Sequence, residues 1–123
     1  MAICLFVLVL LASILSLFSF NKNYNELKNE IENIKECFET ENIDNQLLLE
    51  KTNKLCEKWD TAERSFLIYF HHSALTHIQN AVSKLETYIL FEKYGDYLAE
   101  INTISDEIDD LKDITYPSSK NLL

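Results

Sequence analysis

Apolar residues recur along most of the chain at alternating steps of three and four positions, the spacing that places them on one face of an α-helix. After residue 20 the pattern divides into four such runs. No stretch between them alternates with the two-residue period of a β-strand. The sequence therefore predicts an all-α protein, with an antiparallel bundle of about four helices over residues 21–115. The four runs extend over Tyr24–Phe38, Leu48–Tyr69, Leu75–Ile89 and Tyr94–Leu111.

Short connections between these runs force neighbouring helices to lie antiparallel. Folding the chain at about Asn42, His72 and Gly95 brings apolar residues of different helices to the same height. These residues are the predicted core. Leu27, Trp59, Leu85 and Ile104 are predicted to form one layer, and Ile78 and Leu111 a second layer with Phe66.

Polar residues at the breaks predict where the helices begin and end. Asn42 or Asp44 suits the N-cap of the second helix, and Ser73 suits that of the third. Gly95 suits the left-handed end of a helix, followed by Asp96 as the next N-cap. The single proline, at position 117, predicts the end of the last helix and a flexible tail over 116–123.

The segment Met1–Phe20 contains no charged residue. As a helix, about 20 residues extend about 30 Å, the thickness of the hydrocarbon core of a bilayer. A cleavable signal peptide is the main alternative, but a basic region before the apolar run and a small-x-small cleavage site are both missing. The sequence therefore predicts a transmembrane anchor over residues 1–20, in contact with membrane lipid.

The predicted arrangement brings an aromatic-rich stretch close to the membrane. If the first helix continues unbroken from the membrane to Phe38, the second helix returns and draws level with Asn21 near Glu63. Residues 64–70 then extend about 10 Å further toward the bilayer. One hypothesis places this corner at the lipid interface, and the other encloses it between the remaining helices. The candidate interface residues are Phe66, Leu67, Ile68, Tyr69 and Phe70.

Composition and charge exclude several classes of protein. The chain has one glycine and one proline, too few for the turns and phosphate-binding loops of Rossmann, P-loop, barrel or β-sandwich folds. Its net charge of −9 lies entirely after residue 20. Such an acidic surface repels phosphate backbones, so we expect no nucleic-acid partner.

The reactive side chains of the sequence do not form a recognisable site. His71, His72 and His77 lack the i, i+4 spacing of a helical zinc pair. The acidic stretch from Asp106 to Asp113 lacks the glycine of a calcium loop and is read as a solvated helix face. Neither the serines nor the cysteines have a nucleophile motif around them. We therefore expect no enzyme, no metal and no cofactor.

Several short motifs together resemble a known family. They are the Leu-x-x-x-Trp element of Leu55–Trp59, the aromatic run ending in histidine of Phe66–His72, and the helix Ile78–Ile89. An apolar first helix, an acidic last helix and a tail ending in Ser-x-Asn-Leu-Leu complete the pattern. The chain resembles the bacterial domain-of-unknown-function family 4363, whose small proteins have no established activity. The resemblance implies a helical domain outside the cytoplasm, whereas Lys22, Lys28 and Lys35 after the anchor favour the opposite orientation.

The predicted anchor and helical bundle together lead to a functional expectation. The sequence is read as a non-enzymatic module that binds another protein, a membrane protein at the same surface, because tethering raises the effective concentration of a partner held there. One alternative is an extracytoplasmic ligand-binding or sensory domain with a pocket lined by Trp59 and the tyrosines. Another is a secreted helical protein whose signal is removed.

Overall fold

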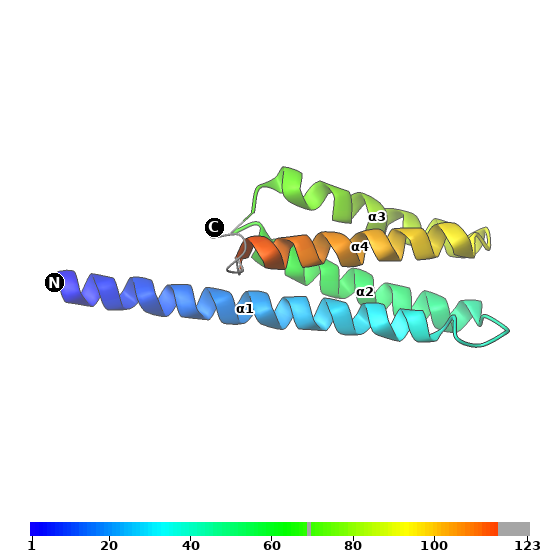
Figure 1. Ribbon diagram of the computed structural model, residues 1–123, viewed down its shortest axis with the longest axis horizontal. Coiled ribbons are helices and arrows are strands. Elements are labelled where there is room, and N and C mark those ends of the chain that lie inside the picture. Colours follow the sequence, from blue (N-terminus) through cyan, green and yellow to red (C-terminus); the bar gives the residue numbers. More distant parts are fainter. Residues whose placement is uncertain (69, 116–123) are drawn as a thin grey trace.

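Four helices make up the computed structural model, which describes residues 1–68 and 70–115. They are α1 (Ala2–Glu36), α2 (Asn45–Phe66), α3 (His72–Leu90) and α4 (Tyr94–Thr115). The chain runs up and down through them, and the first half of α1 projects beyond the other three helices (Figure 1). No strand occurs in the described ranges. The predicted all-α fold, with an apolar first helix ahead of an antiparallel bundle, is confirmed.

The core lies between one apolar stripe from each helix. α1 packs beside α2 and α4, and α3 packs beside the same two helices, so α1 and α3 are diagonal to each other. The structure buries each of the six residues proposed from the sequence as core. These are Leu27, Trp59, Ile78, Leu85, Ile104 and Leu111.

The contacts between α1 and α2 reproduce the predicted turn. Ser19 Oγ lies 3.3 Å from Ser65 Oγ, and the ammonium group of Lys58 lies 3.6 Å from the carboxylate of Glu26. Both pairs are centred on residue 42, the position expected from the sequence. The cap is also as expected, since the Asp44 carboxylate accepts hydrogen bonds from two backbone amides in the first turn of α2.

The next two turns come earlier in the chain than predicted. The indole nitrogen of Trp59 donates to Gln79, a pair centred three residues before His72. Because Leu85 lies six residues beyond Gln79, about 9 Å along α3, it does not share the height of Trp59 as predicted. The Lys84–Glu100 ion pair, at 3.8 Å, is centred on Glu92 rather than Gly95.

Backbone conformation explains the shift at the second of these turns. Glu92 adopts a positive φ of 55°, so it takes the left-handed position that was predicted for Gly95. Gly95 is instead the second residue of α4 and has no positive φ, and Asp96 lies within the first turn. The predictions for Gly95 and Asp96 are therefore wrong.

The prediction of an N-cap at Ser73 is wrong as well. α3 begins at His72, and the preceding His71 has an extended conformation, with ψ of 148° and no side-chain hydrogen bond to the helix. Ser73 is consequently inside the helix. The predicted tail over 116–123 lies outside the described residues.

Candidate functional site

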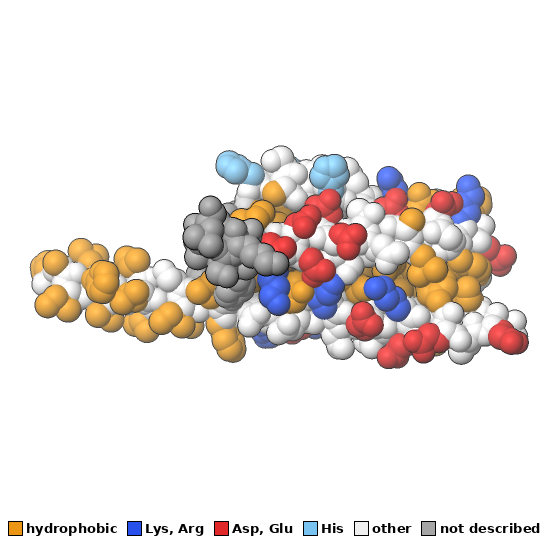
Figure 2. Space-filling model, in the orientation of Figure 1, with side chains coloured by type: hydrophobic (Ala, Val, Ile, Leu, Met, Phe, Trp, Pro, Cys, Tyr) orange, Lys and Arg blue, Asp and Glu red, His pale blue; other side chains and the backbone are white. Residues whose placement is uncertain are grey.

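The projecting half of α1 is the most unusual surface of the molecule. α1 is 35 residues long, and it is long and apolar enough to cross a membrane. A signal sequence has the same features. Large hydrophobic side chains are exposed along this half on every side, and Figure 2 shows them as a rod of hydrophobic atoms leading away from the bundle. An exposed apolar surface of this extent marks contact with lipid or with another protein.

The rod ends where α1 meets α2 through aromatic side chains. Phe18 is 72% exposed, whereas Phe20 is 1% exposed. The ring of Phe20 lies 5.3 Å from the ring of Phe66 and 6.1 Å from that of Phe70, measured between centroids. Phe20 was assigned from the sequence to the anchor, and the structure places it in the core of the bundle. The same residue thus closes the apolar rod and begins the folded domain.

The corner between α2 and α3 holds the five residues proposed as a lipid interface. Phe66 is fully buried, so it is a core residue and has no surface to offer to lipid. Phe70 is half-buried against the core. Leu67 and Ile68 are exposed, and Ile68 is the more exposed of the two at 77%. Tyr69 lies outside the described residues.

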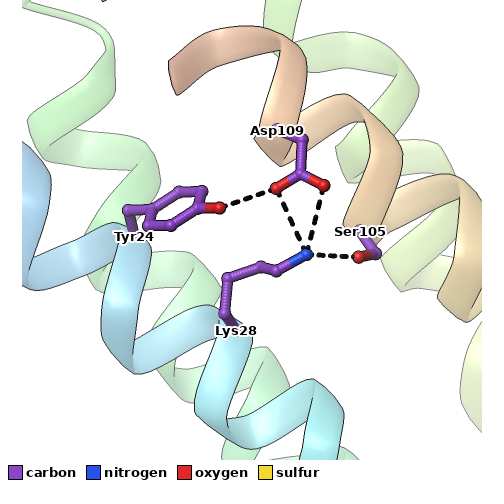
Figure 3. Close-up of polar contacts among 4 residues, drawn as sticks. All are labelled: Tyr24, Lys28, Ser105 and Asp109. Atoms are coloured by element: carbon purple, nitrogen blue, oxygen red, sulfur yellow. Dashed lines mark hydrogen bonds and ion pairs between the residues drawn. The ribbon is translucent and has the colours of Figure 1, made fainter. Parts of the chain in front are cut away.

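A polar seam joins α1 to α4 inside the bundle, a short distance from this end (Figure 3). The Tyr24 hydroxyl donates to Asp109 Oδ1 at 2.7 Å. Lys28 Nζ donates to Ser105 Oγ at 2.6 Å and lies 3.2 Å from Asp109 Oδ1. Lys112 Nζ lies 4.6 Å from the centre of the Tyr24 ring, within the range of a cation–π contact.

Electrostatics in this seam favour the neutral tyrosine and the charged carboxylate. Burial, the hydrogen bond to Asp109 and the nearby acidic charges raise the pKa of Tyr24 to about 12. Partial burial works to raise the pKa of Asp109, but the hydrogen bonds from Tyr24 and Lys28 and the lysine charges outweigh it and hold this pKa below its ordinary value. A charged carboxylate that accepts two donors is a structural clamp, and neither group is poised to exchange a proton near neutral pH.

The opposite end of the bundle carries a second exposed apolar surface. Asn45 at the start of α2 lies 3.5 Å from Glu92 and accepts a hydrogen bond from Tyr94, so the α1–α2 and α3–α4 connections lie together there. Leu90 and Phe91 are exposed at this end. The far-end patch consists of Leu90 and Phe91, whereas Leu47, also exposed, lies on the side of α2 that faces the α1–α2 turn.

A hollow of about 390 Å³ lies at the same end of the bundle, at the turn between α1 and α2, and Leu47 is part of its lining. Its lining carries both signs of charge, from Glu36, Asp44 and Lys51, together with the thiol of Cys37. Burial raises the pKa of the Cys37 thiol, so the thiol stays protonated and is a weak nucleophile. The hollow offers polar contacts to a small molecule but no activated group.

A comparison with protein families identifies the chain. The model of the family described as Domain of unknown function (DUF4363) matches residues 14–122. The chain belongs to this family. The match begins inside the apolar rod and continues through all four helices, so the end of the rod and the bundle belong to one unit of the DUF4363 family. No curated protein and no solved structure matches the chain significantly.

The remaining sequence candidates occupy structural positions in the DUF4363 domain. His71 and His72 lie at the start of α3 and His77 on its outer face, and the described residues contain no group of three potential metal ligands. The side chain of Trp59 is fully buried and its indole nitrogen bonds to Gln79 at 2.7 Å, so it packs in the core of the bundle.

The acidic residues of α4 divide between the solvent and the contact with α1. Figure 2 shows acidic side chains gathered over α4, and Asp106, Asp110 and Asp113 are exposed as expected. Asp109 instead turns to α1 and completes the seam. Sequence reasoning missed this role, because a charged residue one helical position away from the apolar stripe resembles any other solvated acid. The signal that distinguishes it is the tyrosine-x-x-x-lysine spacing of Tyr24 and Lys28, which puts a donor and a cation on one face of α1.

Proposed function

We propose that this DUF4363 member is a single-pass membrane protein whose helical bundle binds another protein at the membrane surface and catalyses no reaction. The observation that carries the proposal is α1, one uninterrupted helix whose first half exposes hydrophobic side chains and whose second half packs into the bundle. Burial of apolar surface is favourable by about 25 cal/mol per Å². A rod with this much exposed apolar surface is therefore stable in a bilayer and unstable in water.

The far-end patch supports a protein as the partner. Exposed apolar side chains gathered at one place mark interaction surfaces, and Leu90 and Phe91 stand at the end that is most distant from the rod. The two connections at this end carry exposed acidic residues, among them Glu39, Glu41 and Glu92. Complementary charge guides association. The partner that fits is a membrane protein presenting an apolar surface with basic residues around it.

Photo-crosslinking in native membranes tests this proposal. A benzophenone amino acid at Phe91 is expected to capture a defined membrane protein, and the same group at Ser83, exposed on the side of α3, is not. A second substitution then tests the surface, since Leu90→Glu should abolish capture and Ser83→Glu should preserve it. Capture that is equal from both positions, or unaffected by Leu90→Glu, would contradict binding at the far-end patch.

The bundle is proposed to lie outside the cytoplasm, as the family resemblance implies and against the direction favoured by Lys22, Lys28 and Lys35. A cysteine introduced at the exposed Leu90, after replacement of the native thiols, provides a test. A membrane-impermeant maleimide should label it in intact cells. Labelling that requires cell lysis would place the bundle in the cytoplasm.

Two alternatives have their own tests. The hollow at the α1–α2 turn favours a ligand-binding or sensory function, since its volume of about 390 Å³ suits a small molecule. A ligand bound there would raise the unfolding temperature of the protein, and Lys51→Glu would remove that shift. A secreted protein with a cleaved signal would yield a mature chain that begins after the rod, which N-terminal sequencing detects.

A further inference from the structure

We propose that the bundle sits end-on in the membrane surface, with the α2–α3 corner and the end of α4 immersed where lipid headgroups meet acyl chains. Phospholipid is the proposed binding partner of this end of the bundle. The inference rests on the proposed membrane anchoring of α1 and extends it from the rod to the folded domain. The membrane-facing edge is defined as Leu67, Ile68 and Ile114.

The register between α1 and α2 sets the depth of the corner. Ser19 and Ser65 are level, with their hydroxyl oxygens 3.3 Å apart. Leu67 continues the helical path beyond α2, with φ of −61° and its amide bonded to Glu63. It is therefore level with Leu17, and Ile68 is about level with residue 16. Lys22 is the first charged residue of α1. At 1.5 Å per residue, the corner lies about 7–9 Å from Lys22 on the apolar side.

The register between α1 and α4 gives the same result independently. Tyr24 bonds to Asp109 at 2.7 Å and Lys28 bonds to Ser105 at 2.6 Å. The two helices are antiparallel, so each step back along α1 from Tyr24 corresponds to one step forward along α4 from Asp109. Ile114 is therefore level with Ser19, which lies within the apolar part of α1. Ile114 is 67% exposed. Two elements that are far apart in sequence thus present large aliphatic side chains at the depth of the rod.

Exposed aliphatic residues are confined to the two ends of the bundle. Among the described residues after Phe20, the exposed large hydrophobic side chains are those of the membrane-facing edge, those of the far-end patch, and Leu47 near the start of α2. The flanks between the two ends bury theirs. Exposure of leucine and isoleucine side chains to water is unfavourable, and their transfer into an apolar phase is favourable. The neighbouring apolar rod supplies that phase at one of these ends.

Charged residues at this end fit a headgroup region. By the same registers, Arg64 and Lys112 are level with residues 20 and 21, next to Lys22. Glu63 and Asp113 share this level, so the ring has three basic and two acidic residues. The large negative charge of the chain, −9 overall, is therefore carried further from the bilayer. Basic side chains with long apolar stems are suited to this position, because their charged ends reach the phosphates.

Depth-dependent quenching on the full chain tests the inference. The three native cysteines are replaced by alanine, and single cysteines at Ile68, Leu90 or Ile14 each receive an environment-sensitive fluorophore. The chains are reconstituted into phosphatidylcholine vesicles that contain lipid with a nitroxide at a shallow acyl position. Leu90 is the matched control, since it is 68% exposed, aliphatic and at the opposite end of the bundle. The emission of Trp59 verifies that each variant is folded.

Quenching at position 68 is expected to be several-fold stronger than at position 90, with position 14 also quenched. Strong quenching at position 14 with equal, weak quenching at positions 68 and 90 would overturn the immersed edge and leave the anchor intact. Equal, strong quenching at 68 and 90 would overturn it too, because the bundle would then lie flat on the bilayer. Absence of quenching at 14 would remove the proposed anchor, and the immersed edge with it.

Discussion

Phe20→Ala separates the two roles that meet at the end of the apolar rod. From its sequence position Phe20 belongs to a membrane segment, and truncating a lipid-facing side chain leaves a soluble domain unaffected. In the structure it is 1% exposed and its ring packs against those of Phe66, Phe70 and Tyr24. We therefore expect Phe20→Ala to destabilise the bundle itself.

The size of this effect follows from the burial of the ring. Replacing a buried phenylalanine by alanine costs about 3–5 kcal/mol, from lost transfer free energy and from the cavity left behind. Phe20 lies at the end of the bundle, where neighbouring side chains can partly fill the space, so we expect about 3 kcal/mol. This is a large part of the about 5–15 kcal/mol that stabilises a typical domain. With a urea dependence of about 1–1.5 kcal/mol per molar, the unfolding midpoint should fall by about 2–3 M.

The assay uses a reporter already present in the chain. Trp59 is the single tryptophan and is fully buried, so its emission moves to longer wavelength when the bundle unfolds. Urea titrations are performed on the full chain in detergent micelles, which keep the rod covered throughout. Phe18→Ala is the matched control, because Phe18 lies two residues earlier, is 72% exposed and should leave the midpoint within error. Equal midpoints for the two variants would refute the assignment of Phe20 to the core.

Three further predictions use the same assay or a pH titration. Asp44→Ala should cost about 0.5–2 kcal/mol because it removes the cap of α2, and Ser73→Ala should cost much less because Ser73 caps no helix. Tyr97→Phe should cost about 0.5–1.5 kcal/mol, since it removes the 2.6 Å hydrogen bond between the Tyr97 and Thr52 hydroxyls while Thr52 still donates to the Leu48 carbonyl. The raised pKa of Tyr24, about 12 in the fold, predicts stability that is complete below pH 10 and declines as the pH rises toward 12, measured by circular dichroism. Burial raises the pKa of Tyr97 as well, so its titration reinforces the alkaline loss.

The sequence was sufficient for the fold class, the four helices and the burial of the six proposed core residues, because each of these depends on local periodicity, but it assigned the buried Phe20 to the anchor. The turn positions depended on less local physics. Gly95 was chosen as the left-handed residue because glycine adopts positive φ without strain, yet Glu92 takes that conformation. The decisive contribution is the packing of α3 against α4, where Ile89 and Tyr97 are both buried, and this is invisible to a rule based on one residue type.

The seam between α1 and α4 was not predictable for a related reason. Tyr24, Lys28 and Asp109 are each ordinary surface residues in their own helices, and they become partners only after α4 has been placed beside α1. That placement depends on the three preceding turns, two of which were shifted by about three residues in the prediction. An error of three residues rotates a helix through most of a turn. Apolar stripes tolerate such an error because many apolar pairs are equivalent, whereas a tyrosine–carboxylate pair is not.

The continuity of α1 determines how the bundle is presented to a partner. The only glycine and the only proline of the chain lie at positions 95 and 117, so no helix-breaking residue interrupts α1 where it leaves the apolar rod. Phe20 and the seam then fix the other helices to α1 on both sides. Such a domain cannot swivel on a linker, and its orientation follows the tilt of the rod. From Phe20 to Glu36, α1 rises about 24 Å, so the proposed membrane anchoring would put the far-end patch at that height above the bilayer. A partner of the kind proposed would then have to present its complementary surface at that distance from the membrane, and contact with its transmembrane segments alone would not suffice.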